Sequence, residues 1–121
     1  MSIKQVNRGV IALIICLFLG LLSSPLYAAK LTSGRQDVAS AGTPEALGSS
    51  QTCDLIYVTA AEGNAGVAVI GESDVVASSG TRTGITLFPG QTIAFPHSNV
   101  ASIYADVATS GDDVEWLCID K

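Results

Sequence analysis

Short apolar runs separated by turn-forming residues fill the chain from Cys53 onward, and they constrain its fold more than any other feature. Runs of four to seven apolar residues recur between clusters of Gly, Ser, Asn and Asp, and no helical period is present. Turn signals about every 8 to 12 residues are typical of antiparallel sandwiches and small barrels. The sequence therefore predicts an all-β domain over residues 53–121: a small antiparallel β-sandwich or barrel of about six to seven short strands.

The turn residues also set the bounds of the expected strands. These strands are residues 53–60, 67–70, 75–77, 85–88, 91–95, 102–108 and 114–119. Pro89-Gly90 suits the centre of a type II turn, because glycine accepts the positive φ that this turn requires. Residues 96–99 are expected to form a loop. Pairing of the first of these strands with the last would bring two cysteines together.

Those two cysteines stand at opposite ends of the predicted domain. The predicted domain runs from Cys53 to Lys121 and has 69 residues. Cys53 is its first residue, and Cys118 lies close to its end. A domain of this size gains only a narrow margin from its hydrophobic core, so a disulfide is expected if the compartment is oxidising. The alternative is two buried free thiols. No metal site and no cofactor are expected, because Cys53, Cys118 and the single His97 include no close-spaced pair of ligands.

Residues 10–22 (VIALIICLFLGLL) form an apolar run that follows two basic residues, Lys4 and Arg8. A basic start, an apolar core and a small-residue exit are typical of an export signal. The uninterrupted core of about 14 residues is shorter than the roughly 20 that span a bilayer as a helix. The sequence favours residues 1–29 as a signal peptide with a hydrophobic helix, cleaved after Ala28 or Ala29. The alternative is a retained N-terminal membrane anchor that leaves the rest of the chain outside.

Residues 30–52 are rich in Ser, Thr, Gly and Ala and show no sustained apolar period. This composition predicts a flexible linker or arm between the export segment and the folded domain. One helical turn is expected over residues 44–47, with Thr43 as its N-cap. From Lys30 onward the chain has four basic and 11 acidic residues, a formal net charge of −7. Such a surface repels phosphate backbones, so nucleic-acid binding is not expected.

Few side chains suggest chemistry. Tyr57, Tyr104 and Trp116 are the candidate binding residues, because three rings together could form a surface on which sugars stack. Core packing of at least two of them is the alternative. The single histidine reads as a solvated loop residue, and the acidic residues read as turn formers or as surface charge: Asp106, Asp112, Asp113 and Glu115. No catalytic set is recognised, so the sequence predicts that the protein is not an enzyme.

From about Ala46 to Ile119 the chain resembles small β-rich proteins encoded by tailed phages and prophages. The resemblance rests on the opening strand at 53–60 and on four further segments: GNAGVAVIGESDV (63–75), LFPGQTI (87–93), SNVASIYAD (98–106) and GDDVEW (111–116). It implies a β-sandwich that contributes to the virion surface or to its attachment apparatus, and it supplies no catalytic residues. An uncleaved N-terminal segment fits a virion with an internal membrane, and a cleaved one fits a phage-derived domain used at the cell envelope.

These observations predict a non-enzymatic structural or interaction module at a virion surface or a cell envelope. The protein is expected to be exported across the inner membrane and to be periplasmic, secreted or membrane-anchored. Its expected partners are proteins, either further copies of itself or virion components, with a surface glycan as a further candidate. Membrane contact is expected only through residues 10–22, and only if they are retained. The alternative function is a secreted carbohydrate- or ligand-binding module.

Overall fold

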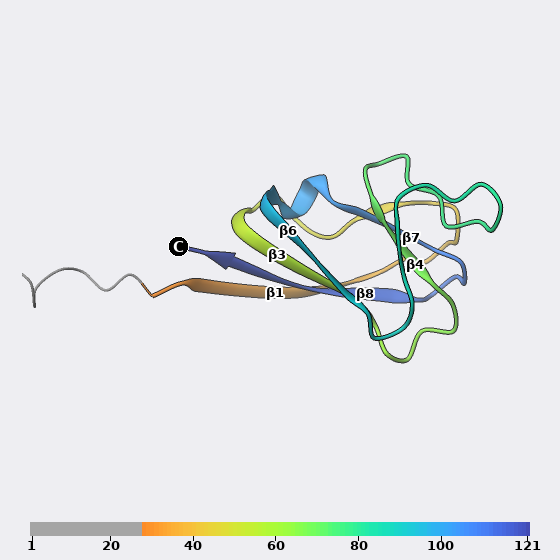
Figure 1. Ribbon diagram of the computed structural model, residues 1–121, viewed down its shortest axis with the longest axis horizontal. Coiled ribbons are helices and arrows are strands. Elements are labelled where there is room, and N and C mark those ends of the chain that lie inside the picture. Colours follow the sequence, from red (N-terminus) through yellow and green to blue (C-terminus); the bar gives the residue numbers. More distant parts are fainter. Residues whose placement is uncertain (1–27) are drawn as a thin grey trace, which may run out of the picture.

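The structure is a computed structural model that describes residues 28–121 as two four-stranded antiparallel sheets (Figure 1). Sheet A has the strand order β1-β8-β3-β6, and sheet B has the order β2-β7-β4-β5. A short 3₁₀ helix, η1, precedes β7. The elements are β1 (Lys30–Asp37), β2 (Glu45–Ala46), β3 (Thr52–Ala60), β4 (Ala68–Gly71), β5 (Ile85–Leu87), β6 (Thr92–Asn99), η1 (Val100–Ser102), β7 (Tyr104–Val107) and β8 (Asp113–Asp120).

The all-β prediction is confirmed, whereas the prediction of an N-terminal signal or anchor concerns residues that are almost all outside the described part of the chain. Within residues 28–121, no helix is long and apolar enough to cross a bilayer. The Pro89-Gly90 turn is also confirmed. Gly90 has a φ of +84°, and the backbone N–H of Gln91 donates to the carbonyl of Phe88 at 2.9 Å.

The prediction that residues 30–52 form a flexible arm is wrong. β1 pairs with β8 along its whole length, from Lys30 opposite Asp120 to Asp37 opposite Asp113. Val38 and Leu47 are buried in the core. The segment also contains β2, which replaces the helical turn expected over residues 44–47. The domain therefore begins at β1, and its first strand is one that the apolar pattern did not identify.

The reason for this error lies in the inward face of β1, which carries almost no apolar side chain. Gly34 sits there, and a Cβ atom on it would lie 2.4 Å from the ring of Trp116 on β8. The indole ring therefore occupies the space that a β1 side chain would fill. It also lies against Gly48, and its Nε1 donates to the carbonyl of Leu47 at 2.9 Å. An edge strand covered by its neighbour's side chain needs no apolar period of its own.

Two other predicted elements also differ. Residues 75–77 form only an isolated bridge, Val76 with Thr83, inside a long excursion between β4 and β5. Residues 96–99, expected to be a loop, continue β6 as far as Asn99. The backbone of His97 is in the left-handed region, with a φ of +47°, which is uncommon for a residue other than glycine. The turn-forming residues predicted that the strand would end here. Instead, β6 continues through a local backbone distortion at His97.

The core lies between the two sheets. Inward-facing aliphatic side chains from β3, β8, β4 and β7 form it: Ile56, Val58, Val114, Ala68, Ile70, Ala105 and Val107. The predicted disulfide is confirmed, and it lies in this core with a Cα–Cα distance of 5.6 Å between Cys53 and Cys118. The in–out alternation of β3 slips between Cys53 and Ile56, which are both buried. This slip turns Cys53 inward, toward Cys118, whose cross-strand neighbour is Ile56.

Candidate functional site

The two sheets differ in what lies on their outer sides. The outer side of sheet B is covered by residues 72–84, whose Val75 and Ala77 pack on Val69 of β4 as a second apolar cluster. Nothing in the described chain covers the outer side of sheet A in this way, and we refer to that surface as the open face. It is formed by Leu31, Ser33, Arg35, Leu55, Tyr57, Thr59, Thr92, Ala94, Pro96, Glu115, Leu117 and Ile119.

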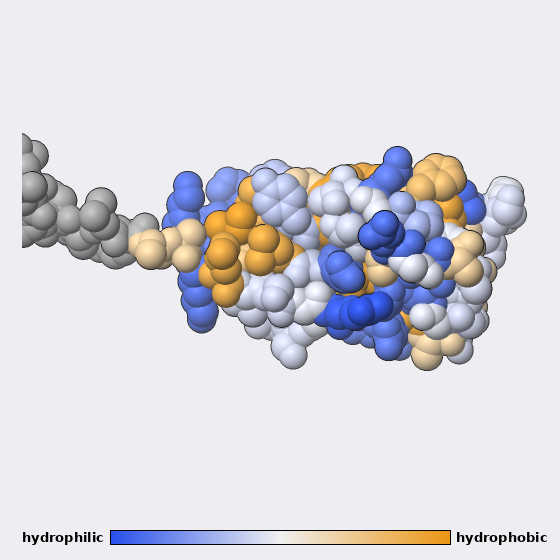
Figure 2. Space-filling view, turned by 90° about the horizontal axis from the view of Figure 1, so that it is seen from below, coloured by the Kyte–Doolittle hydropathy of each residue, from blue (hydrophilic) through white to orange (hydrophobic). Residues whose placement is uncertain are grey.

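The strand registers arrange the open face in three rows that run across all four strands. The first row is apolar: Leu31, Ile119, Leu55 and Pro96. The second is mixed: Ser33, Leu117, Tyr57 and Ala94. The third is polar: Arg35, Glu115, Thr59 and Thr92. Figure 2 shows the resulting gradient, with hydrophobic side chains gathered beside the point where the described chain begins and hydrophilic side chains beyond them.

An open depression of about 410 Å³ lies over the second and third rows. It is lined by Ser33, Gly34, Arg35, Tyr57, Thr59, Glu115, Trp116 and Leu117. Tyr57 is 40% exposed, and Leu31 in the neighbouring row is 63% exposed. The depression therefore combines an accessible aromatic ring with two hydroxyl groups and two charged groups. An accessible ring beside polar groups is a common arrangement at binding surfaces.

Arg35 is the basic group of the open face, and its charge is already paired. Its Nε donates to the carboxylate of Asp113, which is buried beneath it while the arginine stays largely exposed. This hydrogen bond, followed by the charge of the same carboxylate, raises the pKa of Arg35 above its ordinary value. Glu115 and Asp37 stay exposed nearby. The polar end of the face thus presents acidic groups without a free positive charge among its own residues.

The three aromatic candidates do not form one surface. Tyr57 lies on the open face, but Trp116 points to the other side of sheet A, where its ring packs against the core. Tyr104 is on sheet B, packed against the second apolar cluster under the excursion. The predicted three-ring platform is therefore not assembled in this domain, and Tyr57 is the ring that a partner can reach on the open face.

Asp106, interpreted from the sequence as a surface charge, has a structural role that the sequence did not indicate. Asp106 is 1% exposed. Its carboxylate accepts the backbone N–H groups of Gly42 at 2.8 Å, Val107 at 2.9 Å and Ala77 at 2.8 Å. It therefore ties both the excursion and the β1–β2 connection to β7. A lone Asp in an alternating strand reads as a surface charge, so no local signal marks this function.

Asp112 acts in the same way in another loop. Its two carboxylate oxygens accept the backbone N–H groups of Ala65 at 3.0 Å and Gly66 at 2.8 Å, which closes the turn between β3 and β4. His97 is exposed. Within residues 28–121, no group of three or more His, Cys, Asp and Glu side chains is placed to hold a metal ion. The groups that offered chemistry in the sequence thus serve mainly to hold loops in place.

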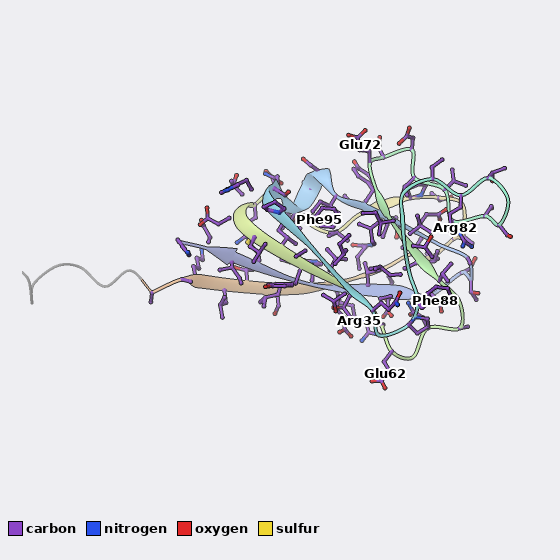
Figure 3. The ribbon with its side chains drawn as sticks, in the orientation of Figure 1. Arg35, Glu62, Glu72, Arg82, Phe88 and Phe95 are labelled. Carbon is purple, nitrogen blue, oxygen red and sulfur yellow. A yellow bond between two sulfur atoms is a disulfide. The ribbon has the colours of Figure 1, made fainter. Side chains whose placement is uncertain are left out.

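Figure 3 places the charged groups relative to these elements. Arg35 lies on the sheet A side of the domain, while Glu72 and Arg82 belong to the excursion on the other side. The Nε of Arg82 donates to the carbonyl of Ala77 at 3.1 Å, so this arginine also serves the excursion. Comparison of the chain with protein-family models, with curated proteins and with solved structures finds no match in any of the three.

Proposed function

We propose that this chain is a non-enzymatic interaction module that binds a protein partner through the open face of sheet A, outside the cytoplasm. The contrast between the two outer sides carries the proposal. One is closed by an excursion anchored on Asp106, and the other leaves a row of aliphatic side chains accessible on a rigid sheet. A small domain stabilised by a disulfide can keep such a row exposed without rearranging, which suits a binding surface.

The charges of the open face favour a particular chemistry in the partner. Arg35 is paired with Asp113, so Glu115 and Asp37 remain as exposed acidic groups at the polar end. The domain as a whole is acidic. A complementary partner therefore presents aliphatic side chains for the first row and lysine or arginine beside the third row. Two acidic surfaces would repel each other here, so the charges guide the approach of a basic partner.

Two observations support a module without catalytic activity. The buried carboxylates of Asp106 and Asp112 are occupied by backbone donors, and Asp113 is occupied by Arg35. His97 is exposed on β6, and its side chain has no activating partner among the hydrogen bonds of the described chain. Turnover of a substrate that is abolished by substitution of His97 or of these aspartates would overturn this part of the proposal.

The proposed setting is a virion surface or a cell envelope, as the resemblance to phage-encoded β proteins implies. The Cys53–Cys118 bond fits an oxidising compartment. Intact mass of the protein from its native source, with and without reductant, tests this setting. Export with cleavage predicts an N-terminus at Ala29 or Lys30. Fractionation of the same material shows whether the protein travels with particles or with the envelope. A full-length protein recovered from the cytoplasm with reduced cysteines would contradict export.

The binding surface is tested by site-specific photo-cross-linking in cells that make the full chain. A photoreactive phenylalanine analogue replaces Tyr57 on the open face, and the same analogue at Phe88 serves as the matched control. Phe88 is 58% exposed and lies in a turn outside the open face. We expect discrete protein adducts at position 57 that are absent at position 88. Identical adduct patterns at the two positions, or none at position 57, would refute the assignment of the face.

The second candidate function is carbohydrate binding, and one observation favours it. The exposed ring of Tyr57 lies in the depression with the hydroxyl groups of Ser33 and Thr59, an arrangement on which a sugar ring could stack and form hydrogen bonds. A glycan array probed with the exported protein tests this function. Binding that is lost in Tyr57→Ala and retained in Tyr104→Ala would favour the glycan over the protein partner. An array without a signal would exclude it.

A further inference from the structure

The edges of the two sheets are not equally protected against pairing with another strand. In sheet B the edge strands are short, with two residues in β2 and three in β5. In sheet A, β6 carries Pro96 and the left-handed backbone of His97, both of which interrupt a regular hydrogen-bonding edge. β1 is eight residues long and contains no proline, and within residues 28–121 it is bonded on one side only, to β8. Among these four edges, β1 alone combines length with regularity.

We propose that β1 pairs antiparallel with β1 of a second copy of this chain, so that two sheets A join into one continuous eight-stranded sheet. This interface uses the free backbone edge of β1, whose outward side chains also form one border of the open face. It does not depend on the function proposed above. Every second residue of an edge strand directs its backbone N–H and C=O groups away from the sheet. Two identical antiparallel edges satisfy these groups mutually across a two-fold axis, which gives a closed dimer.

The two-fold axis limits the registers that are available. It must map the open face of one copy onto the open face of the other, so a residue that points outward has to face another outward residue. Leu31, Ser33, Arg35 and Asp37 point outward from β1. Registers that shift the strands by a single residue would pair outward with inward side chains and are excluded. Two registers with long overlap remain, one centred on Ser33 and one centred on Gly34.

The register centred on Ser33 has the better side-chain pairs. It places Leu31 opposite Arg35 of the second copy, whose aliphatic stem can cover the exposed leucine. It places Lys30 opposite Gln36, so no like charges face each other directly. The register centred on Gly34 instead sets Leu31 opposite the carboxylate of Asp37 and two glycines opposite each other. The side-chain pairs across the strands are therefore more favourable in the register centred on Ser33 than in the register centred on Gly34.

The same edges explain why the assembly closes at two copies. A growing fibre needs β1 of one copy to pair with the other edge of sheet A, which is β6. Pro96 lacks an N–H group, and the left-handed backbone of His97 distorts that edge locally. Each copy carries a formal net charge of −7 over residues 30–121, from four basic and 11 acidic residues. Screening of this repulsion by salt should therefore strengthen the dimer.

The test uses protein made from the full chain and purified in its exported form. Size-exclusion chromatography with light scattering is expected to give twice the mass of one copy. Ser33→Lys places two ammonium groups together at the axis and should return the protein to the monomer mass. Ser102→Lys is the matched control, because Ser102 is also an exposed serine and lies away from β1. The control should stay dimeric. A monomeric wild-type protein, or a dimer that Ser33→Lys leaves intact, overturns the proposal.

A second variant tests the register without weakening the interface. Ser33→Cys places two thiols across the axis, where side chains of a directly opposed pair are about 4.5–5.5 Å apart at Cβ. A short thiol-to-thiol cross-linker should therefore produce a covalent dimer in Ser33→Cys and not in the control Ser102→Cys. Equal cross-linking in both variants overturns the β1 interface. Loss of this dimer while Tyr57 still gives partner adducts would leave the function of the open face standing, so the two proposals fail separately.

Discussion

Replacement of Asp106 by asparagine tests whether one buried carboxylate holds the excursion over sheet B. The Oδ2 atom accepts the N–H of Ala77, while Oδ1 accepts those of Gly42 and Val107. The asparagine side chain can keep its single carbonyl oxygen in the Oδ1 position. Its NH₂ group then faces the buried N–H of Ala77, so a charge-assisted bond is exchanged for two opposed donors.

The expected cost follows from that exchange. A hydrogen bond to a charged group contributes about 1.5–3 kcal/mol, and a buried donor left without a partner adds to the penalty. We therefore expect Asp106→Asn to lower the free energy that is needed to open the excursion by about 2 kcal/mol. This corresponds to roughly a 30-fold larger open population, since about 1.4 kcal/mol is a factor of ten. Global stability in urea should fall by a similar amount if the excursion opens only on unfolding.

Limited trypsin digestion distinguishes local opening of the excursion from opening that occurs only on global unfolding. Arg82 lies on the excursion, whereas Arg35 lies on β1. Cleavage tracks the open population when opening is fast relative to proteolysis. We expect cleavage after Arg82 to accelerate about 30-fold in Asp106→Asn by this relation, with a smaller change after Arg35. Asp74→Asn is the control, because Asp74 is exposed on the same excursion. Equal cleavage after Arg82 in Asp106→Asn, Asp74→Asn and wild type would refute the reasoning.

The remaining predictions concern backbone space and the disulfide. Gly34→Ala should destabilise the domain by about 1–3 kcal/mol in urea unfolding, because the new methyl group overlaps the indole ring 2.4 Å away. Gly90→Ala should cost about 1–2 kcal/mol from its φ of +84° alone. Gly63→Ala, with open space and no positive φ, is the control for both and should leave the urea midpoint unchanged or slightly raised. Reduction of Cys53–Cys118, which are 65 residues apart, should lower the stability by about 4 kcal/mol, and an unchanged melting temperature in reductant would contradict this.

Much of the strand pattern was predictable from local sequence. The apolar run at 53–60 and the alternation at 114–119 both predicted the central strands that form β3 and β8, because residues in the middle of a sheet bury their own side chains. The turn residues at 89–90 predicted the bend before β6 for the same local reason. The expected pairing of the first strand of the predicted domain with the last, now β3 with β8, correctly brought the two cysteines together.

The candidate site was less predictable. Tyr57, Tyr104 and Trp116 look alike in the sequence, since each lies in a short apolar or alternating run. The structure places one ring on the open face, one beneath the excursion and one against the core. Which side of a strand faces solvent depends on what covers it, and coverage by a distant segment leaves no mark in the local pattern.

The sequence by itself determined the fold class, the central strands, the turn at Gly90 and the disulfide pair. The strands follow from the burial of their own apolar residues, the turn follows from the φ preference of glycine, and the disulfide follows from the positions of the two cysteines on the first and last strands of the predicted domain. The tertiary structure decided that β1 belongs to the domain, that Asp106 is buried and that one outer face stays open. In β1, the apolar surface that covers the strand belongs to Trp116 on the neighbouring strand. Around Asp106, the backbone donors come from two separate loops. Contributions made by one segment to the burial of another become visible only when the chain is folded.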